Sequence, residues 1–487
     1  MRLQNPTLLP SLAFIDGRFQ AAQDGGVFNV TNPATGEVIA QVPDMQAADA
    51  NRAVAAANAA WPAWRAKTAK ERAARLQAWF RLILANQEDL ARLMTAECGK
   101  PLAESRAEVI YGASFVEWFA EEGKRTYGEV IPTVMNDRRL LTIRQPVGVC
   151  AMITPWNFPL AMITRKAAPA LAAGCPVVIK PAEATPLTAL ALAVLAQEAG
   201  FPDGVFNILT AAHGAELGAA FCANPTVRKI SFTGSTAVGK LLLRQSADTV
   251  KRVSMELGGN APFIVFDDAD VEAAVAGAMV SKYRNAGQTC VCANRLLVQE
   301  GVYEAFAARL AEETAALTVG DGSEEGVRQG PLINAQAVAK VEAHIADAVE
   351  KGARVLTGGE RHALGGAFFQ PTVLADVSSD MRLAREETFG PVAPLFRFKD
   401  EAEAIRMAND TEYGLAAYFY SRDLGRCWRV AEALEYGMVA VNAGILSTEL
   451  APFGGVKESG LGREGSRQGI EEYMEIKYLA LAGIQKS

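Results

Sequence analysis

A cysteine in a polar turn is the first candidate for chemistry. Cys290 closes the run Arg284-Asn-Ala-Gly-Gln-Thr-Cys290, and such surroundings expose a thiol and can lower its pKa. A thiolate attacks the carbonyl carbon of an aldehyde or an acyl group. Cys292 lies two residues further on, but a lone C-x-C pair without a second pair or a nearby histidine argues against zinc. The pattern predicts a nucleophile, and no metal is expected.

Attack by a thiol on a carbonyl requires a hydrogen-bond donor to the developing oxyanion and a base. Residues at the ends of two expected strands can supply them. Asn157 stands between an expected strand and an expected helix, where its amide can donate to an oxyanion. Glu256 ends an expected strand at the sheet edge where α/β ligands collect, so its carboxylate can activate water. Two alternatives stay open: Asn157 as a helix N-cap, and Glu256 as a solvated charge.

Two glycine-rich segments match nucleotide-binding motifs by letter. Residues 460–465 read G-x-G-x-x-G, but too little chain follows for a βαβ unit of ~30 residues with its acidic residue, so we expect a flexible loop. The turn at Gly234 and Ser235 begins a near P-loop that has Leu241 where Ser or Thr would hold Mg²⁺. Its position before an expected helix still favours phosphate binding over a purely structural turn.

Composition excludes several classes of protein. Lys+Arg 48 against Asp+Glu 55 gives a net charge of −7, and no basic block occurs, so nucleic acid is not an expected partner. The longest nearly apolar stretch, 167–179, is shorter than the ~18 residues that span a bilayer, so no membrane association is expected. The other five of the seven cysteines are scattered, which predicts a reduced, cytoplasmic protein.

The elements that must position these residues form two α/β units. Residues 45–123 are rich in Ala, Glu and Arg with apolar residues at helical spacing, which predicts two or three long helices. Strands and helices then alternate, as in a doubly wound parallel sheet, and the pattern restarts after Gly259. Residues 473–481 are β-prone with no helix after them, so we expect pairing outside their own domain, another subunit being one option.

Six ordered segments resemble the aldehyde dehydrogenase superfamily across essentially the whole chain. Shorter runs resemble its succinate-semialdehyde branch, including relatives that oxidise glutarate semialdehyde; these runs are 290–294, 163–166, 451–455 and 460–465. The six segments are 154–159 (TPWNFP), 180–186 (KPAEATP), 232–235 (FTGS), 256–259 (ELGG), 287–290 (GQTC) and 386–391 (EETFGP).

The resemblance implies a subunit in three parts. A Rossmann-like NAD-binding domain would comprise 1–126 and 147–258, and a catalytic domain 259–460. Residues 127–146 and 461–487 would form a β-strand oligomerisation arm with a C-terminal strand. Such an arm implies a homodimer or a homotetramer.

The resemblance also implies NAD(P) as cofactor. The turn at Gly234 would meet the pyrophosphate, so the dinucleotide would bind there and not at 460–465. Glu183 would accept hydrogen bonds from both adenosine ribose hydroxyls of NAD and repel the 2′-phosphate of NADP. We therefore expect NAD to be preferred, with NADP as the alternative. The implied cofactor residues are Thr154, Trp156, Lys180, Glu183, Gly234, Ser235, Glu387 and Phe389.

For catalysis, the resemblance implies that Cys290 forms a thiohemiacetal, Asn157 holds the oxyanion and Glu256 activates water against a thioester. The expected substrate carries a carboxylate, with succinate semialdehyde ahead of glutarate semialdehyde or another aldehyde. Arg165, Arg284 and Ser447 match the positions that hold this carboxylate. Cys292 matches a redox partner of the nucleophile in regulated relatives, or else it is a packing residue. A CoA-acylating enzyme and a P-loop NTPase are the disfavoured alternatives.

Overall fold

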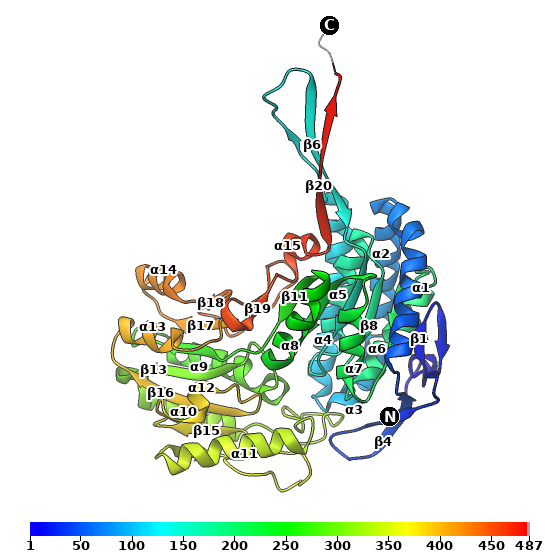
Figure 1. Ribbon diagram of the computed structural model, residues 1–487. Coiled ribbons are helices and arrows are strands. Elements are labelled where there is room, and N and C mark those ends of the chain that lie inside the picture. The colour runs from blue at the N-terminus through cyan, green and yellow to red at the C-terminus, as the bar shows by residue number, and fades with distance from the viewer. Residues whose placement is uncertain (485–487) are drawn as a thin grey trace.

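The alternating pattern after residue 147 builds a sheet of eight strands, in a computed structural model that describes residues 1–484 (Figure 1). Five neighbouring strands run parallel, and β7 and β8 are buried on both faces, as apolar runs of this kind require. The strand order is β19-β11-β10-β7-β8-β9-β1-β2. The parallel strands are β7 (Val149–Ile153), β8 (Val177–Lys180), β9 (Phe206–Ile208), β10 (Val227–Thr233) and β11 (Arg252–Glu256).

The helices expected between these strands are confirmed. They are α5 (Ala161–Ala173), α6 (Pro186–Glu198), α7 (Gly214–Ala223) and α8 (Thr236–Ser246). Three short strands extend the sheet antiparallel at its edges: β1 (Ala13–Ile15), β2 (Arg18–Gln20) and β19 (Gly460–Leu461). The last of these corrects the expected flexible loop at 460–465, because Gly460 pairs with Glu256 of β11. A Cβ at Gly460 would lie 2.0 Å from the Met255 carbonyl oxygen, so only glycine allows this approach.

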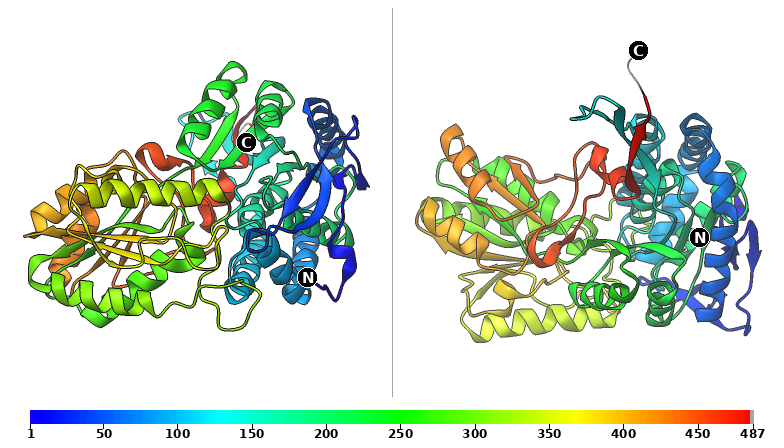
Figure 2. Two further views of the ribbon diagram at one scale, coloured as in Figure 1. Left: turned by 90° about the horizontal axis from the view of Figure 1, so that it is seen from below. Right: turned by 45° about the horizontal axis from the view of Figure 1, so that its top comes forward.

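Four helices occupy the region where two or three were expected. They are α1 (Ala47–Ala66), α2 (Ala69–Ala85), α3 (Gln87–Cys98) and α4 (Leu102–Glu122). A uniform helix-forming composition hides the breaks, which depend on local capping. Thr68 and Glu71 form a capping box that starts α2, and α3 ends at Gly99 with φ +85°. Helix α1 packs with α7 on one face of the first sheet, and α2 packs with α4 on the other face. Both lie at the end of the molecule remote from the second sheet (Figure 2). A hairpin, β3 (Val27–Thr31) and β4 (Val38–Pro43), precedes them.

The second sheet has seven strands in the order β14-β15-β16-β13-β12-β17-β18, all parallel to their neighbours except β14. Its strands are β12 (Ala261–Val265), β13 (Ala293–Gln299), β14 (Arg354–Thr357), β15 (Thr372–Ala375), β16 (Val392–Phe398), β17 (Ala416–Tyr420) and β18 (Met438–Val441). Its helices are α9 (Val271–Tyr283), α10 (Tyr303–Ala315), α11 (Ala335–Glu350), α12 (Arg382–Arg385), α13 (Glu401–Asn409) and α14 (Leu424–Ala433). The expected pair of doubly wound α/β units is confirmed.

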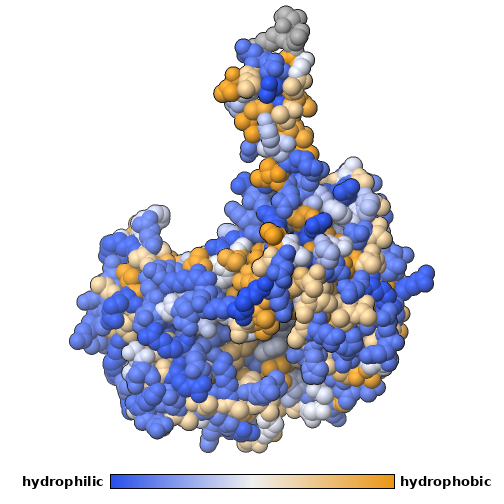
Figure 3. Space-filling model, in the orientation of Figure 1, coloured by the Kyte–Doolittle hydropathy of each residue, from blue (hydrophilic) through white to orange (hydrophobic). Residues whose placement is uncertain are grey.

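A three-stranded ribbon projects from the body (Figure 1). It consists of β5 (Val130–Ile131), β6 (Arg138–Pro146) and β20 (Met474–Ala482), and the short α15 (Ser466–Glu471) leads into it. The β-prone C-terminal segment therefore pairs with β6 of its own chain, antiparallel from Met474↔Pro146 to Ala482↔Arg138. Apolar side chains gather on this ribbon (Figure 3), and Val134 is 98% exposed. Residues 485–487 of the expected arm lie outside the described residues.

Among residues 1–484, no helix combines the length and the apolar character that crossing a membrane requires.

Candidate active site

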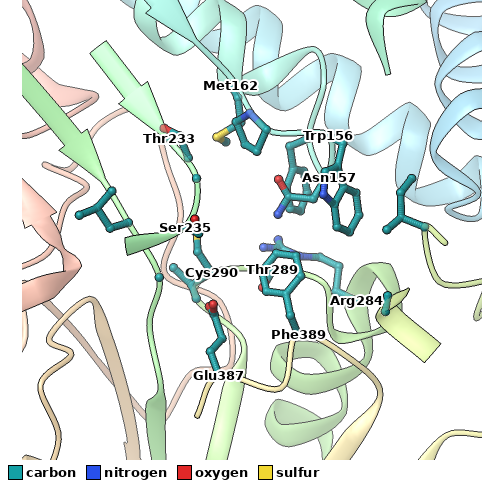
Figure 4. Close-up of a pocket in the computed structure, with 18 of the residues that line it drawn as sticks. Trp156, Asn157, Met162, Thr233, Ser235, Arg284, Thr289, Cys290, Glu387 and Phe389 are labelled. Atoms are coloured by element: carbon teal, nitrogen blue, oxygen red, sulfur yellow. The ribbon is translucent and has the colours of Figure 1, made fainter. Parts of the chain in front are cut away.

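A cavity of about 400 Å³ lies where the two sheets face each other (Figure 4). Segments that follow β7, β10 and β11 line it from the first sheet, as ligands of parallel sheets collect at the carboxyl ends of strands. Segments that precede β13 and β16 line it from the second sheet. Of the predicted site residues, those on the cavity wall are Trp156, Asn157, Arg165, Gly234, Ser235, Arg284, Cys290, Glu387, Phe389 and Ser447.

The thiol of Cys290 faces this cavity from a constrained turn. Asn285 and Ala286 both adopt left-handed backbone conformations (φ +49° and +54°), and Gly287 follows at φ +74°. A Cβ at Gly287 would lie 2.1 Å from the Gly390 carbonyl oxygen, so the turn needs glycine there. The lowered pKa that the polar turn favoured is not found, because burial raises the pKa of the Cys290 thiol to about 12, although the guanidinium groups of two nearby arginines oppose this rise.

Cys292 has different surroundings from its neighbour. Its side chain is fully buried, outside the cavity wall, and Sγ lies 3.4 Å from the Lys282 carbonyl oxygen, to which it can donate.

Asn157 faces the nucleophile turn across the cavity (Figure 4). Its Nδ2 donates to the Gln288 carbonyl oxygen at 2.9 Å, while Oδ1 is buried without a hydrogen-bond partner. The helix N-cap alternative is wrong, because α5 begins at Ala161 and its N-cap residue is Leu160. The amide has one N–H left for a ligand, close to the backbone of the Cys290 turn.

Glu256 is the last residue of β11 and is buried, which excludes the solvated charge considered above. Neither carboxyl oxygen has a hydrogen-bond partner within residues 1–484, and the residue is absent from the cavity wall. Burial raises the pKa of Glu256 well above its usual range, and the neighbouring carboxylate of Glu464 raises it further. The carboxyl would have to turn to reach the cavity that the Cys290 thiol faces.

One part of the cavity wall carries hydrogen-bond donors that lack an acceptor among the described residues. Arg284 forms no ion pair among the described residues, and its guanidinium lies over the Phe158 ring at 5.2 Å. Arg165 pairs with Glu464 through Nε, yet its Nη2 is buried without a hydrogen-bond partner. The Tyr111 hydroxyl is also buried and lies in the field of both arginines. Unpaired donors of this kind suit an anion.

Sequence reasoning missed Tyr111, because it lies within the apolar helical pattern of α4, where an aromatic residue indicates packing. It also missed Phe453, whose ring lies 4.0 Å from the Arg165 guanidinium carbon and keeps that group in place. The resemblance of 451–455 to the succinate-semialdehyde branch was the one available signal for Phe453.

The cofactor residues predicted in the first sheet fit a dinucleotide. Ser235 caps α8, and its Oγ accepts from the Val238 amide at 3.4 Å, so a helix N-terminus faces the cavity beside Gly234. A Cβ at Gly234 would meet the Phe232 ring at 2.4 Å, so the turn is bare backbone. The hydroxyl of Thr154 is buried without a partner among the described residues, and Thr154 lies outside the cavity wall.

Lys180 and Glu183 lie outside the cavity wall, at the end of β8. Lys180 Nζ is 3.2 Å from Glu183 Oε2, and the Glu183 side chain is 55% exposed. The pair follows β8, which lies two strands from β10 along the same edge of the sheet.

The predicted cofactor residues that precede β16 are held in place by contacts with other segments of the protein. Glu387 accepts a hydrogen bond from the Gly259 amide at 3.1 Å, and burial raises the pKa of this carboxyl to about 7. Phe389 has φ +56° and packs edge-to-face on Trp156, with ring centroids 5.6 Å apart. The segment thus closes the cavity against the first sheet.

Fold and site together define a two-domain α/β enzyme with a cysteine thiol between a dinucleotide-type sheet and a second parallel sheet. A model of the family described as "Aldehyde dehydrogenase family" matches residues 19–479. The chain belongs to the aldehyde dehydrogenase family. The fold and the enzyme class expected from the six segments are therefore confirmed, and enzymes of this family use NAD or NADP on small aldehydes.

Curated relatives are similar over their whole length. A 3-sulfolactaldehyde dehydrogenase of Pseudomonas putida is 62% identical over 100% of both chains. A glutarate-semialdehyde dehydrogenase of Pseudomonas aeruginosa and an NADP(+) succinate-semialdehyde dehydrogenase of Escherichia coli are each 61% identical, over 99% of this chain and 100% of theirs. The crystal structure of a succinate-semialdehyde dehydrogenase from Burkholderia pseudomallei superposes with a TM-score of 0.98 at 61% identity, covering 99% of this chain and 100% of that one.

Proposed function

We propose that this enzyme oxidises aldehydes that carry an acidic group at the far end, with succinate semialdehyde to succinate as the leading reaction. One observation carries the proposal: the Arg284 guanidinium lines the same cavity as the Cys290 thiol and has no carboxylate partner among residues 1–484. A distal carboxylate would supply that partner in a dry site. The relatives named above act on succinate semialdehyde, glutarate semialdehyde and sulfolactaldehyde, all of which bear a distal anion. Glutarate semialdehyde is the alternative substrate.

In the proposed reaction, the Cys290 thiolate adds to the aldehyde carbon. Nδ2 of Asn157 and the Cys290 amide donate to the oxygen as it becomes negative, while Arg165, Arg284 and Ser447 hold the distal carboxylate. When bound, a nicotinamide ring would supply the hydride acceptor for oxidation of the thiohemiacetal to a thioester. Glu387 and Phe389 would hold that ring and its ribose, and Trp156 packs on Phe389.

Release of the product requires water. Glu256 would turn toward the thioester, take a proton from a water molecule and direct the hydroxyl to the carbonyl carbon. The carbon–sulfur bond then breaks, the acid leaves and the sulfur recovers a proton. A buried carboxylate with both oxygens unpartnered favours hydrolysis over transfer to CoA, because it provides a base for water.

We further propose that NAD is preferred over NADP. Glu183 supports this preference, since its carboxylate lies at the proposed ribose site and would repel a 2′-phosphate. The succinate-semialdehyde relative of Escherichia coli carries NADP(+) in its name, so the preference of this chain needs its own measurement.

Three finer expectations stay proposals. The arm (127–146 and 461–487) would assemble a homodimer or homotetramer, which its exposed apolar side chains support. Cysteines without disulfides support a cytoplasmic location. Cys292 would form a reversible disulfide with Cys290, although its Sγ lies against the Lys282 carbonyl oxygen and would have to turn.

Steady-state kinetics test the proposed function. NADH or NADPH formation should be followed at 340 nm with succinate semialdehyde, glutarate semialdehyde and butanal, each with both cofactors. We expect kcat/KM for the two semialdehydes to exceed that for butanal by about 100-fold, the effect of one or two charge-assisted hydrogen bonds. Equal values for butanal and the semialdehydes would refute the acidic substrate class.

A further inference from the structure

A buried lysine from the N-terminal helices contacts the backbone of the proposed oxyanion donor. Lys100 lies between α3 and α4, far from Asn157 in sequence, and its side chain is 1% exposed. Its Nζ donates to the Asn157 carbonyl oxygen at 2.6 Å and lies 4.1 Å from the centre of the Phe158 ring. Nothing in the proposed reaction uses this cation directly.

The same ammonium is paired with a carboxylate that holds the next part of the loop. Lys100 Nζ is 2.5 Å from Oε2 of Glu108, which is also 1% exposed. The other oxygen, Oε1, accepts from the Leu160 and Ala161 amides at 3.0 and 3.2 Å. These are N–H groups at the start of α5, which would otherwise lack partners. The ion pair therefore holds the short loop that carries Asn157 at Asn157 itself and at its junction with α5.

A second carboxylate of α4 holds the nucleophile turn. Glu104 lies one helical turn before Glu108, so the two side chains share a face of the helix. Its Oε2 accepts from the Asn285 amide at 2.8 Å, at the first of the two left-handed residues that shape the Cys290 turn. Asn285 Nδ2 in turn donates to the Asn157 carbonyl oxygen at 3.2 Å. The two halves of the proposed oxyanion site meet on this one face.

We propose that Lys100 and Glu108, with Glu104, are positioning residues that set the distance between the Asn157 amide and the Cys290 backbone N–H. The inference rests on the proposed function, because it assigns those two groups to the oxyanion. A buried ion pair is a weak means of stabilisation, since well-packed apolar side chains can replace it at little cost. Positioning explains its presence better, because the pair ends on the backbone of the Asn157 loop, while Glu104 on the same helix face ends on the backbone of the Cys290 turn. A transition state is sensitive to misplacement of this kind.

The test compares reactions of Cys290 that do and do not form an oxyanion. Acylation by p-nitrophenyl acetate passes through a tetrahedral oxyanion and needs no cofactor, whereas alkylation by iodoacetamide displaces iodide and forms none. The principal variant is Lys100→Met with Glu108→Gln, which removes both charges of the pair and keeps an acceptor for the Leu160 amide. Lys100→Arg is the conservative variant. A matched control is Lys229→Met with Glu472→Gln, a pair of 3.4 Å between a buried lysine and a carboxylate near β20.

We expect the principal variant to lower the rate of ester acylation and kcat with succinate semialdehyde by about 10- to 100-fold. The rate of iodoacetamide alkylation and KM should change less than about threefold, because the thiol and the substrate clamp stay in place. Lys100→Arg should recover part of the loss. The control pair should keep both rates near those of the wild type.

Two outcomes would overturn the inference. One is ester acylation at the wild-type rate in a variant that is folded by circular dichroism. The other is an equal loss of acylation and alkylation, which indicates a general disturbance of the turn. Asn157→Ala separates this failure from that of the proposed function. If Asn157→Ala is impaired and the Lys100 variant is not, the positioning role fails; if Asn157→Ala itself is unimpaired, the oxyanion assignment fails.

Discussion

Glu464 links the proposed base to the proposed substrate clamp through a buried ion pair with Arg165. Nε of Arg165 lies 2.5 Å from Oε2 of Glu464, and the side chains are 1% and 5% exposed. The other oxygen of Glu464 accepts from Lys166. Burial alone would raise the pKa of Glu464, but the two cations outweigh it and lower that pKa, so the group stays charged. This fixed negative charge in turn raises the pKa of Glu256.

Neutralising Glu464 should therefore move the pH profile of turnover. Glu464→Gln removes the repulsion on Glu256 and frees two cations that stabilise its carboxylate, so the pKa of Glu256 falls. A carboxyl acts as a base only above its pKa, hence the rise of kcat with pH should shift toward acid by about one pH unit. Rates measured from about pH 6 to about pH 9 check this. Glu475→Gln, on the exposed arm, is the control. A pH profile of Glu464→Gln that is unshifted or shifted toward alkaline pH would contradict this prediction.

Glu256→Gln should separate the two halves of the reaction. The amide cannot take a proton from water, whereas attack by Cys290 and hydride transfer do not require it. We expect a burst of NADH of about one equivalent per active subunit, followed by turnover slowed by about 100-fold or more. Stopped-flow absorbance at 340 nm measures both phases. Unaltered steady-state turnover would remove Glu256 from this role, and Cys290→Ser should show neither burst nor turnover.

Arg284→Ala should weaken the reaction of acidic aldehydes alone. The guanidinium forms no ion pair with a carboxylate among the described residues. Its removal therefore leaves no carboxylate unpaired there and weakens mainly the binding of the substrate. We expect kcat/KM for succinate semialdehyde to fall by about 100-fold, equal to about 3 kcal/mol for a charge-assisted hydrogen bond. Butanal should change less than about threefold. Arg406→Ala, an exposed arginine of α13, serves as the control. Equal losses with both aldehydes would refute the carboxylate clamp.

Glu183→Ser should change the choice of cofactor. The substitution removes the carboxylate that would repel a 2′-phosphate and leaves Lys180 without its partner at 3.2 Å. A free ammonium there attracts phosphate, so the ratio of kcat/KM for NADP to that for NAD should rise by about 10- to 100-fold. Initial rates with each cofactor measure this ratio. Glu198→Ser, at the end of α6, is the control. A wild-type enzyme that already prefers NADP would show that Glu183 does not decide the preference.

Much of this site was predictable because its motifs stand at strand ends. Asn157 and Glu256 follow or end parallel strands, and the carboxyl ends of such strands meet at one edge. The alternation of apolar strands and helices was equally predictable from the sequence, since both faces of these sheets are buried. Cys290 was predictable from its polar turn, although the left-handed residues that shape this turn have no signature of their own.

Other contacts depend on three-dimensional packing and have no local signature in the sequence. Tyr111 and Glu108 lie in α4, where the sequence indicates only a helix in a scaffold. Their roles come from a crossing of α4 with the loop before α5, far away in the chain. The breaks among the first four helices were hidden by uniform helix propensity. The resemblance placed the segments of β6 and β20 in one arm, but their register was not predicted, because two distant strands show no register in sequence.

His344 should matter for cofactor binding although it lies behind the cavity. Its ring is fully buried, with Nδ1 3.2 Å from Thr388 Oγ1 and Nε2 3.1 Å from Glu386 Oε2, on either side of Glu387. Burial lowers the pKa of His344, so the ring is neutral at pH 7, and the carboxylate of Glu386 assigns the proton to Nε2.

His344→Leu removes both contacts and should loosen the segment that carries Glu387 and Phe389. We expect KM for NAD to rise by about tenfold, the equivalent of one or two lost hydrogen bonds, with little change in KM for succinate semialdehyde. His344→Gln, which keeps a donor, should recover part of the affinity. His362→Leu is the matched control, because in the described part of the chain that ring accepts only from the Leu364 amide in its own loop. An unchanged KM for NAD in a folded His344→Leu enzyme would show that Glu387 holds its position without this histidine.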